Sequence, residues 1–190
     1  MKQTLLLLAA VLLLTACHSD YTPKPVAYLR FDMPPHEYAD FDTNALPFAF
    51  QQPRNADVII KKNTPKETYI DIVYPDWRAY LFLTYKPIHS LDDLSAQVDT
   101  SYAFMKQHFD YSTGLDEQRY INPEGRVYAT TYRLKGTSVA STYQFWATDS
   151  TRHFLRGALF IDCTPNNDSL SPILSYLHED VEHLIETLHW

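Results

Sequence analysis

The feature that most restricts the fold of this chain is a series of three turn signals in its second half. Residues 122–125 (Asn-Pro-Glu-Gly) carry the residue types that a type I turn prefers at successive positions. Further turns are indicated at 135–136 (Lys-Gly) and at 149–151, where short polar side chains can bond the local backbone. The β-rich segments between these turns end at 121 or cover 127–134, 138–147 and 153–163. Consecutive strands joined by tight turns run antiparallel, so the sequence predicts a β-meander.

Two other segments have the three-and-four spacing of one helix face. In the first, at 91–107, the apolar positions are Leu91, Leu94, Val98, Tyr102 and Met105. In the second, at 169–188, they are Leu170, Ile173, Leu174, Leu177, Val181, Leu184, Ile185 and Leu188. Ser90 and Asp93 resemble a capping box at the start of the first helix. The opposite face of the second helix is expected to be solvated, and it carries His178, Glu179, Glu182, His183 and Glu186.

The first half of the chain is less regular. Five prolines interrupt residues 33–66, where only short strands at 48–50 and 58–60 are indicated. Residues 68–74 and 80–85 are rich in β-branched and aromatic side chains, and the short turn between them predicts a hairpin. Together these elements predict an α+β domain: a largely antiparallel sheet with two main helices, at about 91–107 and 169–188, packed on it.

The N-terminus carries a targeting signal. Lys2 precedes an apolar run at 5–14, which is about ten residues long and too short to cross a bilayer as a helix. Residues 14–17 (Leu-Thr-Ala-Cys) then resemble a lipobox, so we expect Cys17 to be the first mature residue and to carry lipid. An ordinary secretory signal that happens to precede a cysteine is the alternative.

This interpretation divides the chain into three parts. Residues 1–16 are the expected signal peptide, 17–27 a lipidated N-terminus with an extended, proline-containing tether, and 28–190 a single globular domain. The lipid would anchor the protein without spanning the membrane. Because His18, and not an inner-membrane retention Asp, follows the cysteine, we expect an outer-membrane lipoprotein that faces the periplasm.

Charge and cysteine content exclude several functions. The formal net charge is −7, and removal of the signal, which holds one Lys and no acidic residue, makes it more negative. A polyanion would be repelled, so nucleic acid is not an expected partner. Cys163 is the only cysteine besides Cys17, which excludes an intramolecular disulfide, and its apolar surroundings predict a small core residue.

Catalytic and metal-binding patterns are not found in the sequence. His178 and His183 are five residues apart, about 140° around a helix, whereas a zincin helix needs histidines four apart. Asp116 and Glu117 would point to opposite faces of a strand and would not form a dyad. Neither a Gly-x-Ser-x-Gly motif nor a glycine-rich phosphate loop is present. We therefore expect no enzyme activity, no cofactor and no metal, although a hydrolase whose residues converge only in space stays open.

Binding is the remaining kind of function. An extended arm could add a strand to a partner, so Tyr21, Tyr28 and Arg30, together with exposed sheet edges, are candidate contacts. Trp146 is a further candidate because Tyr143 and Phe145 point away from it on the same strand. The aromatic side chains of this strand, like those of Tyr80, Phe82 and Tyr85, could instead stack on sugars. The alternative function is therefore that of a carbohydrate- or peptidoglycan-binding lipoprotein. For most of these aromatics we expect core packing.

Several motifs in a fixed order resemble the GldD gliding-motility lipoproteins of Bacteroidetes. They are DYTPKP at 20–25, LTYKP at 83–87, INPE at 121–124, TDSTRHFLRGAL at 148–159 and PNNDSL at 165–170. The resemblance covers the whole mature chain. It implies a lipid-anchored envelope protein that supports gliding motility and the associated type IX secretion machinery through contacts with other gliding and secretion lipoproteins.

The resemblance brings no catalytic residue. It also implies two cysteines at places where this chain has Leu46 and Thr68. Any cross-link between the segment at 41–50 and the following sheet would therefore be replaced by packing.

Overall fold

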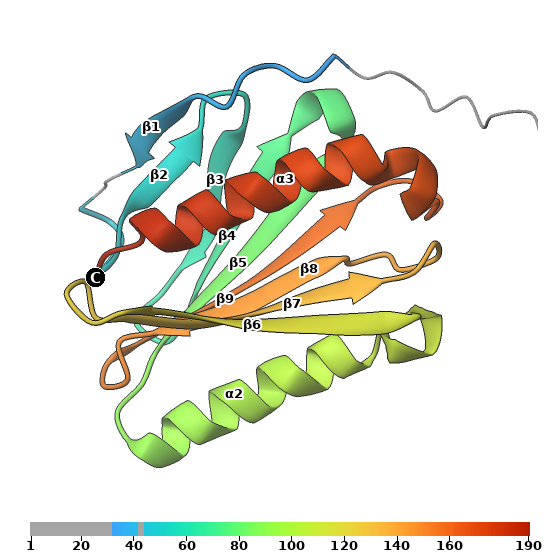
Figure 1. Cartoon of the computed structure of the whole chain (residues 1–190). Helices are drawn as coiled ribbons and strands as arrows, with labels where there is room; N and C mark the ends of the chain where they lie inside the picture. The colour runs from blue at the N-terminus through green and yellow to red at the C-terminus, as the bar shows by residue number, and fades with distance from the viewer. Residues whose placement is uncertain (1–31, 42–43) are drawn as a thin grey trace, which may run out of the picture.

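A computed structural model describes residues 32–41 and 44–190 (Figure 1). Seven strands form one antiparallel sheet in the order β3-β4-β5-β9-β8-β7-β6, and β1 and β2 form a separate hairpin. The strands are β1 (Tyr38–Phe41), β2 (Phe50–Pro53), β3 (Asp57–Asn63), β4 (Thr68–Tyr74), β5 (Ala79–Pro87), β6 (Gly114–Asn122), β7 (Val127–Lys135), β8 (Tyr143–Thr148) and β9 (His153–Ile161). The helices are α2 (Leu91–Lys106), α3 (Asn167–Thr187) and two 3₁₀ turns, Pro75–Trp77 and Phe109–Tyr111.

Helix α2 lies on one face of the sheet and α3 on the other (Figure 1). The predicted α+β class with a largely antiparallel sheet is confirmed, as are the meander β6–β9 and the hairpin β4–β5. β5 pairs with β9, from Ala79↔Ile161 to Pro87↔His153, so α2 carries the chain past three strands to β6. β3 and β6 thereby become the two edges of the sheet.

The core on the α3 face is the larger one. The predicted apolar stripe of α3 points into it, and Leu177, Val181 and Leu184 have no exposed surface. On the sheet side, the ring of Phe145 lies over Gly157 of the neighbouring strand, where a methyl group would overlap it. Glycine is therefore required at this position to let the aromatic ring pack flat against the sheet.

The core on the α2 face is small. It consists of Met105, Tyr132, Leu134 and Val139, with partly buried side chains around them. The predicted cap is present, since Ser90 Oγ accepts the N–H of Asp93 at 3.1 Å. The predicted apolar stripe is largely unburied, however: Met105 is covered, whereas Leu91 is 76% and Tyr102 42% exposed.

The tight turn between β8 and β9 is organised by one carboxylate. Asp149 Oδ1 accepts the backbone N–H groups of Thr151, Arg152 and His153 at 2.7 to 2.9 Å, while Ser150 adopts a left-handed φ of 67°. Burial opposes ionisation of Asp149, but these hydrogen bonds outweigh it and hold the pKa of the carboxyl well below its ordinary value. The predicted turn at 149–151 is thus organised around the buried carboxylate of Asp149.

The segment at 32–41 and the β1–β2 hairpin cover α3 from outside the sheet (Figure 1). The two short strands expected at 48–50 and 58–60 correspond to β2, which begins at Phe50, and to the longer β3. β1 was not predicted. Its four residues carry too little pattern of their own to be distinguished from a loop.

The place where the family resemblance implies a cross-link is held by an asparagine. Asn63 Nδ2 donates to the carbonyl of Ala45 at 2.8 Å, and its Oδ1 accepts from Thr68 Oγ1 at 3.0 Å. Leu46 is partly buried against the main core, and Thr68 is buried. Polar bonding through Asn63 therefore accompanies the expected packing.

Candidate interaction surfaces

Four of the five predicted site residues lie outside the described ranges: the lipidation residue Cys17 and the arm residues Tyr21, Tyr28 and Arg30. Trp146 is described. It lies on the α2 face, opposite to the face of Tyr143 and Phe145, and it is partly buried there. Its Nε1 donates to Tyr132 Oη at 3.3 Å, and part of the ring stays accessible. Its role in partner contact remains a prediction.

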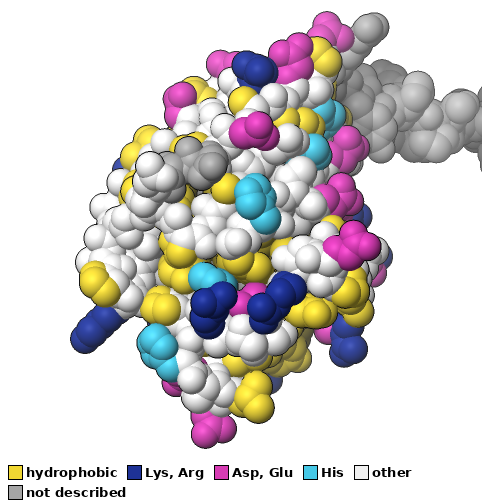
Figure 2. Space-filling view, turned by 90° about the vertical axis from the view of Figure 1, so that its left-hand side faces the viewer, with side chains coloured by type: hydrophobic (Ala, Val, Ile, Leu, Met, Phe, Trp, Pro, Cys, Tyr) yellow, Lys and Arg dark blue, Asp and Glu magenta, His cyan; other side chains and the backbone are white. Residues whose placement is uncertain are grey.

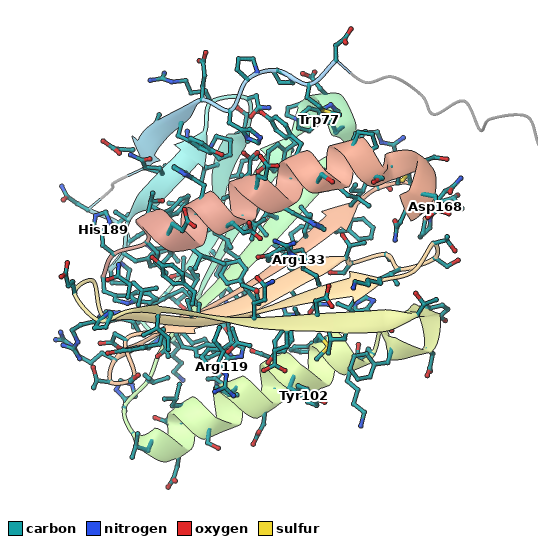
Figure 3. All side chains as sticks on the ribbon, viewed as in Figure 1. Trp77, Tyr102, Arg119, Arg133, Asp168 and His189 are labelled. Atoms are coloured by element: carbon teal, nitrogen blue, oxygen red, sulfur yellow. The ribbon has the colours of Figure 1, made fainter. Side chains whose placement is uncertain are left out.

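The prediction that one face of α3 is solvated is wrong for three of the five residues on it, His178, Glu182 and His183. Glu182 forms an ion pair with Arg133 of β7, and Figure 3 shows Arg133 between α3 and β6. His183 Nε2 bonds Gln51 Oε1 at 2.8 Å, and His178 Nε2 bonds Thr142 Oγ1 at 3.1 Å. These groups are partly buried because the β1–β2 hairpin and the β7–β8 region flank the helix. Glu179 and Glu186 are exposed, as predicted.

His178 is held in its neutral form. Burial, with a contribution from the nearby Arg133 guanidinium, lowers the pKa of its imidazole to about 4. A neutral imidazole can accept from Thr142 through one nitrogen and donate through the other. His178 thus acts as a hydrogen-bonding group at neutral pH and carries no charge there.

The segment at 32–37 and the start of β1 are joined to α3 by a cluster that we call the strap clasp. It consists of His36, Tyr38, Tyr176, Glu179, Asp180 and His183. His36 lies between two carboxylates, with Nδ1 2.8 Å from Asp180 Oδ1 and Nε2 3.0 Å from Glu179 Oε2. Tyr38 Oη donates to the same oxygen of Asp180 at 3.0 Å. The two rings stack on α3: His36 on Tyr176 at 3.9 Å between centroids, and Tyr38 on His183 at 3.6 Å.

Asp180 is the buried centre of the strap clasp, with 2% of its surface exposed. Burial raises the pKa of its carboxyl, and the bonds from His36 and Tyr38 act against that rise. The other carboxylate oxygen, Oδ2, has no hydrogen-bond partner among the described residues. A buried acid of this kind is tolerated because several donors converge on it.

A groove of about 960 Å³ with a mixed polar and apolar lining runs between the N-terminal half of α3 and the ends of β7 and β8. Six hydroxyl side chains line it: Thr113, Thr137, Thr142, Ser169, Ser171 and Ser175. His178 lies in the groove, and Pro172 contributes no backbone N–H, which leaves the carbonyl of Asp168 without its usual helical donor. The groove therefore offers mainly uncharged donors and acceptors, together with the charged Lys135 and Asp168.

On the side of the sheet where α2 lies, the helix leaves the surface around Tyr80, Phe82 and Phe160 uncovered. We call this second surface the open face. Leu81 and Leu83 are buried on the α3 side, so the alternating Tyr80 and Phe82 point to the other face. Helix α2 packs over β8 and β9 and leaves this region uncovered. Phe82 is 40% exposed, its ring stacks on Tyr80 at 5.7 Å, and Phe160 lies 6.4 Å away.

The residues that were candidates for catalysis or metal binding do not lie together. No group of three or more His, Cys, Asp or Glu residues in 32–41 and 44–190 is arranged to hold a metal ion. Asp116 bonds Lys135 at 2.8 Å on the α3 side of β6, and Glu117 points the other way, as predicted. The prediction for Cys163 is wrong: it is exposed, because β9 ends at Ile161 and the cysteine belongs to the loop beyond it.

Charge is also dispersed on the face shown in Figure 2. Basic, acidic and histidine side chains are mixed there with apolar ones, and no large area of one sign is visible. None of the helices in the part of the chain that the structure covers is long and apolar enough to cross a membrane.

The fold and these surfaces define a small antiparallel α+β protein in which the segment at 32–37 packs on the C-terminal helix, α3. The chain belongs to the gliding motility lipoprotein GldD family, whose model matches residues 18–190. Membership implies lipid anchoring at the cell envelope. No curated protein matches the chain. The solution structure of cyanobacterial PsbP (CyanoP) from Synechocystis sp. PCC 6803 is similar over 87% of this chain and 99% of that chain, with 14% identity and a TM-score of 0.47.

Proposed function

We propose that this gliding motility lipoprotein acts without catalysis, through protein–protein contacts that support gliding and the associated type IX secretion machinery. Lipid on Cys17 would hold it at the outer membrane, with the folded part facing the periplasm. Its partners would be other gliding and secretion lipoproteins and envelope proteins.

The open face is the observation that carries this proposal. Phe82, at 40% exposure, points to the side of the sheet that α2 leaves uncovered, and Tyr80 and Phe160 adjoin it. Ile59, at 41% exposure, lies on the same side beyond Asp71. Contiguous exposed aromatic surface is typical of protein interaction sites, and aromatic side chains are the usual anchors of such sites. A partner with an apolar patch of its own would bury these rings.

The decisive test replaces Phe82 by Ser in the full-length chain, in cells that lack the native copy. We expect loss of colony spreading and of the envelope proteins cross-linked to the parent, because the exposed anchor is removed. Leu91→Ser is the matched control, since Leu91 is 76% exposed but lies at the start of α2, away from the open face. Normal spreading and unchanged cross-links in Phe82→Ser cells would refute the proposal.

The arm is the second proposed contact. Deletion of residues 18–30 with the lipidation signal kept would remove Tyr21, Tyr28 and Arg30, and we expect partner recovery to fall. Trp146→Ala tests the remaining predicted contact residue. Unchanged recovery in the deletion would assign partner contact to the folded part alone.

The groove favours the alternative, a peptidoglycan- or carbohydrate-binding lipoprotein. Its six hydroxyls and the neutral His178 match the uncharged hydroxyl and amide groups of a glycan. Calorimetric titration of the full-length protein in detergent with soluble peptidoglycan fragments tests this alternative. Saturable binding that Ser175→Tyr abolishes would support it, and absence of heat at millimolar fragment would exclude it.

A further inference from the structure

The two edges of the sheet differ in how well they are protected against pairing with another strand. β3 has a register shift between Ile60 and Lys62, and it carries Lys61 and Lys62. Bulges and lysines are the usual means by which edge strands avoid association. β6 has neither a bulge nor a proline: it pairs with β7 in unbroken register along its whole length of nine residues.

Among residues 32–41 and 44–190, no strand neighbours the outer side of β6, and the strand lies in front in Figure 1. α2 packs over β8 and β9, and the principal strand contact of α3 is β2. Every second backbone N–H and C=O of β6 points outward along this edge. The edge is therefore a template of nine residues for an additional strand.

The side chains of β6 have a symmetric chemical order around its centre, Gln118. Leu115 and Ile121 lie three residues to either side, and Glu117 and Arg119 lie one residue to either side. All four point to the α2 side of the sheet, as Figure 3 shows for Arg119. Glu117 and Arg119 are exposed and form no hydrogen bond or ion pair within 32–41 and 44–190, and Ile121 is 65% exposed.

We propose that β6 pairs antiparallel with β6 of a second copy of this chain, with Gln118 opposite Gln118. In this register Glu117 of each copy faces Arg119 of the other, and Leu115 faces Ile121. Two opposite-charge pairs and two apolar pairs then form across one two-fold axis, as an isologous interface requires. The inference depends on β6 alone and is independent of the proposed function.

Charge disfavours the two registers centred on the positions next to Gln118. A slide that centres the pairing on position 117 places Glu117 opposite Glu117, and one centred on 119 places Arg119 opposite Arg119. Like charges directly opposite on neighbouring strands are destabilising. A register in which Gln118 faces an odd-numbered residue would turn α2 of one copy to the α3 side of the other, because side chains alternate along a strand, and a two-fold axis does not allow that arrangement.

Cysteine cross-linking tests the register in the full-length lipoprotein. In a Cys163→Ser background, Gln118→Cys brings two thiols face to face, so mild oxidation in native membranes should give a product of twice the monomer mass. Glu124→Cys, at an exposed turn position, is the matched control and should give none. A monomeric product at 118, or a cross-link there to a chain of another mass, would overturn the proposal; the latter would assign the added strand to a different protein.

Charge exchange tests the pairing by reversible association, followed by sedimentation of the detergent-solubilised protein. Glu117→Arg and Arg119→Glu should each weaken self-association by at least about tenfold, because two cross-strand pairs become repulsive. An equimolar mixture of the two variants should associate again, since each Arg then faces a Glu. Glu124→Arg is the control for net charge. Equal self-association of all variants, or no recovery in the mixture, would refute the pairing.

Discussion

The two faces of the sheet differ in how completely they are covered. On the α3 face, the helix, the β1–β2 hairpin and the strap clasp enclose a continuous core, and Leu177 and Val181 have no exposed surface. On the α2 face, the core around Met105 is small, and Phe82 and Ile59 stay exposed beyond the helix. One face holds the fold together, and the other leaves apolar surface exposed, which is the surface that we propose for partner contact.

The largest expected effect belongs to the α3 face. Leu177→Ala removes a fully buried side chain and leaves a cavity, which should lower the free energy of unfolding by about 3–5 kcal/mol. Met105→Ala on the α2 face should cost about 2–3 kcal/mol, because its small core can relax more easily. Urea denaturation of both variants measures the difference. An equal loss for Met105→Ala would break the contrast between the faces.

Close packing on the α3 face gives the next prediction. Gly157→Ala places a methyl group where the Phe145 ring lies, and the forced displacement should cost about 1–3 kcal/mol. Gly114→Ala is the matched control at the sheet edge, where an added Cβ would meet Lys135 Cδ at an ordinary 3.7 Å. Thermal unfolding compares the two. A stable Gly157→Ala variant would show that the ring can move.

The acid response of the α3 face sharpens the comparison further. His178 has a pKa lowered to about 4 in the folded state, so the unfolded chain binds the proton first as the pH falls. Stability should therefore decrease as the pH falls from about 6.5 to about 4, by up to about 3 kcal/mol. His178→Gln should reduce this slope in denaturation curves measured across that window. An unchanged slope would assign the acid sensitivity to other groups.

The smallest expected effect on stability lies on the open face. Phe82→Ser removes an exposed ring and should change the free energy of unfolding by less than about 0.5 kcal/mol. The same variant is expected to lose partner contact, so its urea midpoint should match the parent while its function does not. A marked loss of stability would place Phe82 among the structural residues.

Local pattern was sufficient to predict the helices, the meander and the β4–β5 hairpin, because their periodicity and turn residues act within a few positions. One detail was not predicted there: Arg126, between the β6–β7 turn and β7, adopts a left-handed φ of 53°. What the pattern could not predict is which remote segment covers a polar face. His36 and Asp180 of the strap clasp are 144 positions apart, and no helical spacing indicates such a partner.

The candidate surfaces were predicted only in part, because they too depend on contacts between segments that are distant in the chain. Alternation placed Trp146 on the face opposite to Phe145, but it could not show that α2 covers much of that face. Phe82 is exposed because α2 packs over β8 and β9, and β6 is an edge strand because β5 pairs with β9. Both depend on long-range topology. The symmetric order of Leu115, Glu117, Arg119 and Ile121 is visible in the sequence, and it gains meaning once β6 is known to be an edge.

The strap clasp also has a mechanical consequence. The segment that leads toward Cys17 joins β1 at Tyr38, and the rings of His36 and Tyr38 are both stacked on α3. Tension along a membrane tether would therefore load the stacked rings and the two carboxylates around His36 in shear, and the sheet would be strained only after these contacts yield. Any pull on the tether would be borne first by these contacts.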